Sequence, residues 1–93
     1  VNTPEIFIPV AEEYKFSVMS RIIEDSAFSD GKVNTLDGIR VDFKDGWGLL
    51  RASNTNAVLT ARFEASSEEA LEAIKQTFRV QINAAVPDLE LNF

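Results

Sequence analysis

The 93-residue sequence contains neither cysteine nor histidine. Without cysteine there is no disulfide framework and no thiol nucleophile, and without histidine there is no imidazole base for a catalytic triad. The two absences also remove the side chains that bind most zinc, copper and iron ions in proteins. We therefore expect no metal and no cofactor in this chain, and any site must act through carboxylates, hydroxyls, amides and cationic groups.

Long apolar runs and an excess of positive charge are also missing. No stretch approaches the roughly 18 apolar residues of a membrane-spanning helix, and the start of the chain lacks the basic-then-apolar order of a signal peptide. Nine Lys and Arg residues against fifteen Asp and Glu residues give a net charge of −6, which repels nucleic-acid backbones. We expect a cytoplasmic protein with no nucleic-acid partner and no membrane partner.

The composition is that of one globular domain. Hydrophobic residues make up 45% of the 10.3 kDa chain, with only four glycines and three prolines. Because the chain begins at Val1 rather than Met, we expect a fragment of a larger protein. Residues 1–4 are expected to be a linker or hinge, and residues 5–93 the domain itself.

Hydrophobic periodicity predicts an α+β fold. Apolar and alternating segments indicate strands at residues 6–10, 33–36, 39–43, 47–52 and 58–65, and three- and four-residue spacings indicate helices at residues 12–25 and 66–86. The order of strand, helix, consecutive strands and helix predicts a mainly antiparallel sheet of four or five strands with both helices on one face. The other face would be free for a partner.

Local signals specify the turns and the start of the second helix. Asp37-Gly38 is typical of a two-residue type I′ hairpin turn. Ser66, followed three residues later by Glu69, predicts a capping box.

The same patterns assign four residues to the core or to the surface. Phe16 and Phe78 fall on the apolar stripes of the two helices and are expected in the core, whereas Lys15 is expected on the polar side of the first helix. Trp47 could stack a sugar, but a tryptophan that begins a strand is expected in the core.

Between two predicted strands, the loop at residues 51–56 concentrates polar groups. Its four candidate binding residues are Arg51, Ser53, Asn54 and Thr55. All of them can donate hydrogen bonds, as a phosphate cradle requires, and none is a nucleophile with a base beside it. Alternatively, Ser, Asn and Thr in such a loop bond to the backbone and simply shape the turn.

Three segments carry a resemblance to a known family. DGIRVD at residues 37–42, GWGLLRASNT at 46–55 and LTARFEA at 59–65 resemble, in order and spacing, the C-terminal domain of bacterial phosphomannomutase/phosphoglucomutase enzymes in the α-D-phosphohexomutase family. The similarity extends over nearly the whole chain. It implies an enzyme that interconverts sugar 1-phosphates and 6-phosphates, of mannose, glucose or both, through a bisphosphorylated intermediate.

The resemblance also implies a division of labour among four domains. The serine nucleophile would lie on the first domain, a magnesium site mainly on the second, and sugar contacts on the third. The fourth domain, which this chain resembles, would have a TATA-binding-protein-like fold and would share the phosphosugar with the others. Arg51, Ser53, Asn54 and Thr55 would hold its non-transferring phosphate, and the isolated chain would be inactive. Ala57 stands where family members commonly have proline.

Other residues have competing interpretations. Arg62 could add charge to the phosphate site, although a solvated surface arginine is the simpler expectation. Asp42, Asp45 and Glu64 could suggest a metal cluster, but acids near hairpins are usually solvated turn residues. A second functional hypothesis is a stand-alone module that binds a protein or small molecule on the open face of the sheet.

Overall fold

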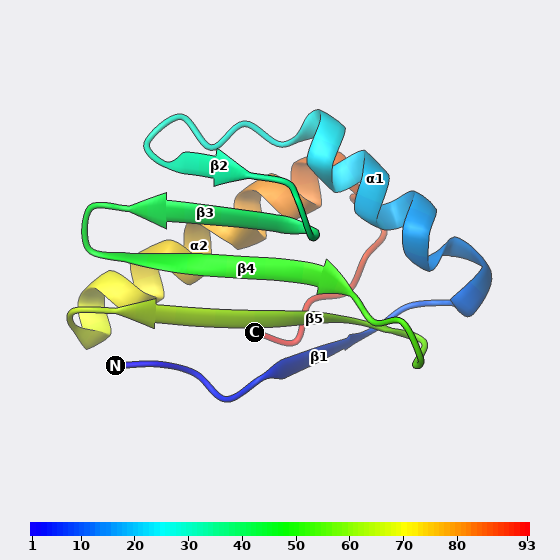
Figure 1. The fold of residues 1–93 in the computed structure, drawn as a ribbon, viewed down its shortest axis with the longest axis horizontal. Coiled ribbons are helices and arrows are strands. Elements are labelled where there is room, and N and C mark those ends of the chain that lie inside the picture. The colour runs from blue at the N-terminus through cyan, green and yellow to red at the C-terminus, as the bar shows by residue number, and fades with distance from the viewer.

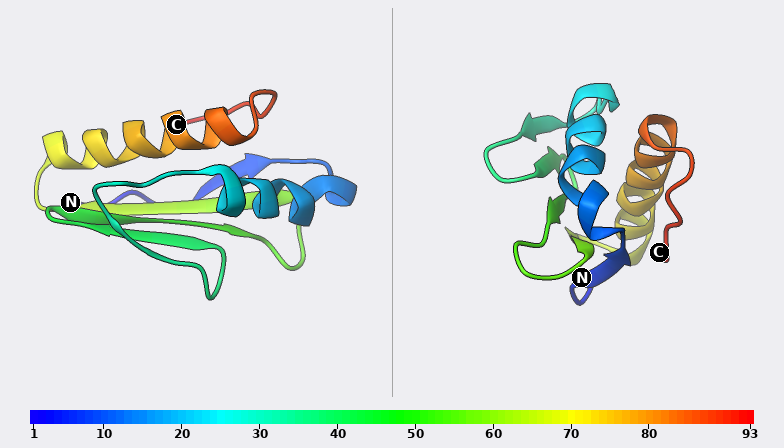
Figure 2. Two further views of the ribbon diagram at one scale, coloured as in Figure 1. Left: turned by 90° about the horizontal axis from the view of Figure 1, so that it is seen from above. Right: turned by 90° about the vertical axis from the view of Figure 1, so that its right-hand side faces the viewer.

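The computed structural model describes residues 1–93 and shows an open, antiparallel, five-stranded sheet with both helices on one face (Figures 1 and 2). The strands are β1 (Ile6–Pro9), β2 (Lys32–Asn34), β3 (Ile39–Phe43), β4 (Gly46–Ala52) and β5 (Val58–Ala65). The helical segments are the 3₁₀ turn η1 (Glu12–Tyr14) and the helices α1 (Lys15–Asp25) and α2 (Glu68–Ala85). The strand order β1-β5-β4-β3-β2 confirms the predicted α+β class.

The longest pairing in the sheet joins β4 and β5. It runs from Gly46 opposite Ala65 to Ala52 opposite Leu59. Successive strand residues point to opposite faces, so the residues with the parity of Leu59 face the helices. These side chains are at most 5% exposed, as predicted: Leu59, Ala61, Phe63 and Ala65.

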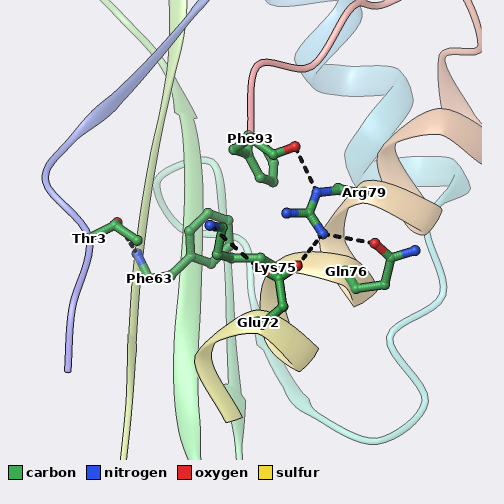
Figure 3. A network of polar contacts seen from close by, with 7 residues as sticks. All are labelled: Thr3, Phe63, Glu72, Lys75, Gln76, Arg79 and Phe93. Atoms are coloured by element: carbon green, nitrogen blue, oxygen red, sulfur yellow. Dashed lines mark hydrogen bonds and ion pairs between the residues drawn. The ribbon is translucent and has the colours of Figure 1, made fainter. Parts of the chain in front are cut away.

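Backbone pairing along β5 continues beyond the edge strand β1 to the first residues of the chain. Val1 and Ala65 exchange two backbone hydrogen bonds, of 3.0 and 2.8 Å, and the Thr3 amide donates to the Phe63 carbonyl at 3.0 Å. The Phe63 amide in turn donates to the Thr3 hydroxyl oxygen at 3.2 Å (Figure 3). The segment expected to be a linker therefore lies along β5, and a hinge motion there would have to break these bonds.

The core is centred on Phe78 of α2, which is fully buried. Its ring centroid lies 4.8 Å from that of Phe28 and 5.1 Å from that of Phe63. Gly48 of β4 lies directly beneath the ring, and a Cβ there would come within 2.5 Å of Phe78. The absence of a side chain at residue 48 thus lets α2 pack closely on the sheet.

The N-cap of the second helix lies one residue later than predicted. Its N-cap is Ser67, whose backbone is extended and whose hydroxyl oxygen accepts the Ala70 amide at 3.1 Å. Ser66 instead donates its amide to the Asp45 carbonyl at 2.9 Å and belongs to the connection from β5. The predicted capping box of Ser66 and Glu69 is therefore wrong. A capping box needs a spacing of three residues, and Glu69 lies only two residues beyond the actual cap.

The buried face of α1 also differs from the prediction. Lys15, Val18, Met19 and Ile22 are buried, whereas Phe16 is 59% exposed. A helix turns by about 100° per residue. An error of one residue in the predicted apolar stripe therefore assigns the wrong face of the helix to the core. The assignments of Phe16 to the core and Lys15 to the polar side were wrong, while that of Phe78 is confirmed.

The turn between β2 and β3 is wider than the predicted two-residue turn. Residues 35–38 separate the strands, and the Asn34 side-chain oxygen accepts the Leu36 amide at 2.9 Å. Gly38 has φ of +76°, but Asp37 does not have positive φ. A type I′ turn requires positive φ at both central residues, which excludes that geometry.

The C-terminal tail returns along α2 and is held by Arg79 (Figures 2 and 3). Its guanidinium donates to the Phe93 carbonyl at 2.7 Å, to Glu72 at 2.7 Å and to the Gln76 side chain at 2.8 Å. The hydrogen bond from Arg79 lowers the pKa of Glu72. The Phe93 ring packs 5.3 Å from that of Phe63, so the tail closes the core beside β5.

We expect Phe78→Ala to lower the free energy of unfolding by about 3–5 kcal/mol, because it leaves a cavity between α2 and the sheet. Phe16→Ala should cost less than about 1 kcal/mol, because that ring is mostly solvated and contributes only a cation–π contact. Denaturant unfolding of the two variants measures both values. Similar losses would contradict the observed orientation of α1.

We expect Ser67→Ala to destabilise the chain by about 1 kcal/mol, because the Ala70 amide loses its cap. Ser66→Ala is the matched control and should change stability by no more than about 0.5 kcal/mol. Thermal or denaturant unfolding distinguishes them. A larger loss for Ser66→Ala would place the cap where the sequence pattern first suggested.

Candidate functional site

The connection between β4 and β5 lies at one end of the sheet, beside β1 (Figure 1). It forms one wall of a hollow of about 380 Å³. Arg51, Thr60 and Phe7 are cross-strand neighbours on β4, β5 and β1, and they share the open face. The complete lining is Glu5, Phe7, Arg51, Ser53, Asn54, Thr55, Asn56 and Thr60.

The four predicted binding residues, Arg51, Ser53, Asn54 and Thr55, all line this hollow. Three further lining residues come from elsewhere in the chain: Glu5, Phe7 and Thr60. Sequence patterns alone do not reveal them, because their place depends on the register of β1 against β5. The alternating pattern of 58–65 does place Thr60 on the open face, but it does not show which residue lies opposite.

Ser53 organises the loop. Its hydroxyl oxygen accepts the amides of Thr55 and Asn56 at 3.3 and 3.1 Å, and its own amide donates to the Val58 carbonyl at 3.1 Å. Side-chain-to-backbone bonds therefore shape this turn, as one of the two interpretations expected. A hydroxyl that accepts two bonds still has its own proton to donate. Shaping the loop and donating to a ligand are therefore compatible roles for Ser53.

Arg51 supplies the positive charge in the hollow. Its side chain is 40% exposed, and Nε lies 3.9 Å from the carboxylate of Asp37, which is 78% exposed. A solvated pair of this kind contributes about 0–1 kcal/mol, so it leaves the guanidinium available to a stronger anion. Gly38 allows this approach, because a Cβ there would overlap the Leu50 carbonyl. The hollow also contains one carboxylate, that of Glu5.

Trp47 was predicted in the core, and this is wrong. Gly48 takes the buried position on β4, so Trp47 lies half-buried on the open face, and the Arg40 guanidinium stacks 4.4 Å from its ring. Asp42 accepts two hydrogen bonds from Arg40, at 3.2 and 3.1 Å, and thereby raises the pKa of Arg40. Trp47 lies at the opposite end of β4 from the loop and does not line the hollow.

Arg62 lies on the open face opposite Leu49 and outside the lining of the hollow. No group of three acidic residues is gathered as a metal site would need, so Asp42, Asp45 and Glu64 do not form such a cluster. None of the helices is both long and apolar enough to cross a bilayer.

Comparisons with known proteins agree with the observed fold. The sequence profile of the phosphoglucomutase/phosphomannomutase C-terminal domain matches residues 5–81. The chain is 48% identical over its full length to phosphomannomutase/phosphoglucomutase of Pseudomonas aeruginosa, and 38% identical over 86 residues to phosphoglucomutase of Neisseria meningitidis, covering 90% of the chain. It covers 20% and 19% of these relatives.

A solved structure shows the same architecture. The phosphoglucomutase/phosphomannomutase family protein of Burkholderia thailandensis superposes with a TM-score of 0.88 at 38% identity, over 100% of this chain and 19% of that one. The chain therefore belongs to the phosphoglucomutase/phosphomannomutase family, as its C-terminal domain. It spans about a fifth of the length of the relatives it matches.

We expect Ser53→Ala to speed amide exchange at Thr55 and Asn56 by roughly fivefold, because each lost neutral hydrogen bond is worth about 1 kcal/mol. Hydrogen exchange followed by NMR measures this. Ser17→Ala, which removes a hydroxyl bonded to the Tyr14 carbonyl at 2.9 Å, is the control and should leave the loop unchanged. Unaltered exchange at Thr55 and Asn56 would contradict the organising role of Ser53.

Proposed function

We propose that the hollow formed by Arg51, Ser53, Asn54 and Thr55 holds the non-transferring phosphate of a phosphosugar. The observation that carries this proposal is the convergence of these four donor residues on one hollow of about 380 Å³. Arg51 can bind a phosphate through two parallel hydrogen bonds. Ser53, Asn54 and Thr55 can each add one donor.

The same residue set supports binding rather than chemistry. The hollow contains no pair of nucleophile and base, and its single carboxylate, from Glu5, would oppose a bare phosphate. A carboxylate is, however, a good acceptor for hydroxyl groups. The combination of donors and one acceptor suits a ligand that carries both a phosphate and hydroxyls, which is the chemistry of a phosphosugar.

By family membership, the domain would act within a larger enzyme. That enzyme would interconvert the 1-phosphate and 6-phosphate of glucose, mannose or both, in the carbohydrate metabolism of the cytoplasm. A serine nucleophile and a magnesium ion on other domains would transfer the phosphoryl group. The bisphosphorylated intermediate would reorient within the site, so one cradle would hold either phosphate in turn. The isolated chain, which lacks the other domains, would be inactive.

Affinity in the isolated chain is expected to be weak. About four or five hydrogen bonds to a charged group, at roughly 1.5–3 kcal/mol each, give a gross gain of about 6–15 kcal/mol. Association removes about 4–15 kcal/mol in lost freedom. The two contributions nearly cancel, so the Kd for phosphate should be on the order of millimolar or weaker.

We expect titration with inorganic phosphate to shift the backbone amides of residues 51–56 and to leave α2 almost unchanged. Arg51→Ala should abolish these shifts without unfolding the domain, because the side chain is a partly exposed donor outside the core. Arg62→Ala removes the same charge outside the lining of the hollow and is the matched control. Shifts that survive Arg51→Ala, or that disappear equally in Arg62→Ala, would refute the assignment.

A further inference from the structure

Lys15 is the only buried charged side chain in the protein. It is 1% exposed and lies in the buried stripe of α1 with Val18, Met19 and Ile22. Burying an ammonium group is costly unless it is both paired and hydrogen-bonded. An apolar residue would fill this position without that cost, so the charge at residue 15 calls for a specific role.

The contacts of Lys15 point away from its own helix and toward the β4–β5 loop. Its Nζ lies 2.9 and 3.0 Å from the two carboxylate oxygens of Glu12, and it donates to the Asn56 carbonyl at 3.0 Å. The Phe16 ring lies 5.0 Å away. Glu12 neutralises the ammonium, while the bond to Asn56 joins residues 41 positions apart in the chain.

A short chain of hydrogen bonds leads from Lys15 into the hollow. The Asn56 carbonyl accepts Lys15 Nζ and also the Val58 amide, at 2.9 Å. The Asn56 amide donates to the Ser53 hydroxyl oxygen at 3.1 Å. Two donors on one carbonyl restrict the orientation of Asn56, and Asn56 in turn holds the hydroxyl of a candidate binding residue.

We propose that Lys15 is a positioning residue for the β4–β5 loop: its ammonium fixes Asn56 and so holds Ser53, Asn54 and Thr55 in the arrangement that binds a phosphate group. Lys15 does not line the hollow and touches no ligand there. Its effect on ligand binding rests on the proposed function, whereas its effect on loop order does not. The alternative is that Lys15 only pairs with Glu12 at the start of α1.

The decisive variant is Lys15→Met, which retains an unbranched side chain and removes the ammonium. We expect altered amide shifts and lower NMR order parameters at residues 53–57. The amide shifts and order parameters of the sheet should stay unchanged. The Kd for inorganic phosphate should rise by roughly 3- to 10-fold. Lys75→Met is the matched control, because Lys75 pairs with Glu72 on α2 at 3.7 Å and its loss removes the same charge away from the loop.

A measurement on the unaltered chain guards against a Lys15→Met variant that fails to fold. With lysine side chains labelled with nitrogen-15, we expect a slowly exchanging Lys15 ammonium signal and a through-hydrogen-bond coupling to the Asn56 carbonyl carbon. Its absence would overturn the proposal whether or not the variant folds. Its presence, with a mobile loop in Lys15→Met, supports the proposal.

The outcomes separate this inference from the proposed function. An ordered loop in Lys15→Met would overturn the positioning role, and so would a disordered loop with unchanged phosphate affinity. If the unaltered chain shows no response to phosphate, the proposed function fails. The loop order in Lys15→Met against Lys75→Met would then still decide whether Lys15 holds the loop.

Discussion

The pairing of β4 with β5 is the constraint on which both the core and the candidate site depend. Its register puts Gly48, Leu50 and Phe63 on the helix-facing side, where Gly48 and Phe63 meet the Phe78 ring of α2. The same register puts Arg51 opposite Thr60 on the other side, at the mouth of the connecting loop. A one-residue slip would reverse both faces, so selection for a packed core also fixes the side on which the guanidinium appears.

The sequence was informative wherever one regular pattern decided the outcome. Alternation along 58–65 predicted a strand with one buried face, and the apolar spacing in α2 predicted the burial of Phe78. The pattern failed where tertiary structure overrode it. Lys15 occupies a buried position because a carbonyl from a distant loop satisfies its ammonium. Trp47 is displaced from the core because Gly48 must lie beneath a ring of α2.

The sequence predicted the residues of the candidate site that are close together in the chain, but not those that the tertiary structure brings to it. Arg51 and the polar residues after it stand together in the sequence, so their proximity follows from the loop itself. Glu5 and Phe7 reach the same hollow only because β1 pairs with β5 from the far end of the chain. Local patterns identify the hydrogen-bond donors, whereas the contribution of Glu5 and Phe7 depends on the topology of the sheet.

Hydrogen bonds from outside the β4–β5 connection also restrain its end. The Val10 amide donates to the Ala57 carbonyl at 3.1 Å, and Lys15 donates to the adjacent Asn56 carbonyl at 3.0 Å. The segment from Val10 to Lys15 thus contacts the end of the loop from outside. Ser53 restrains the same loop from within through the amides of Thr55 and Asn56, so Asn56 is bonded from both sides, and the buried ammonium of Lys15 has a partner outside α1.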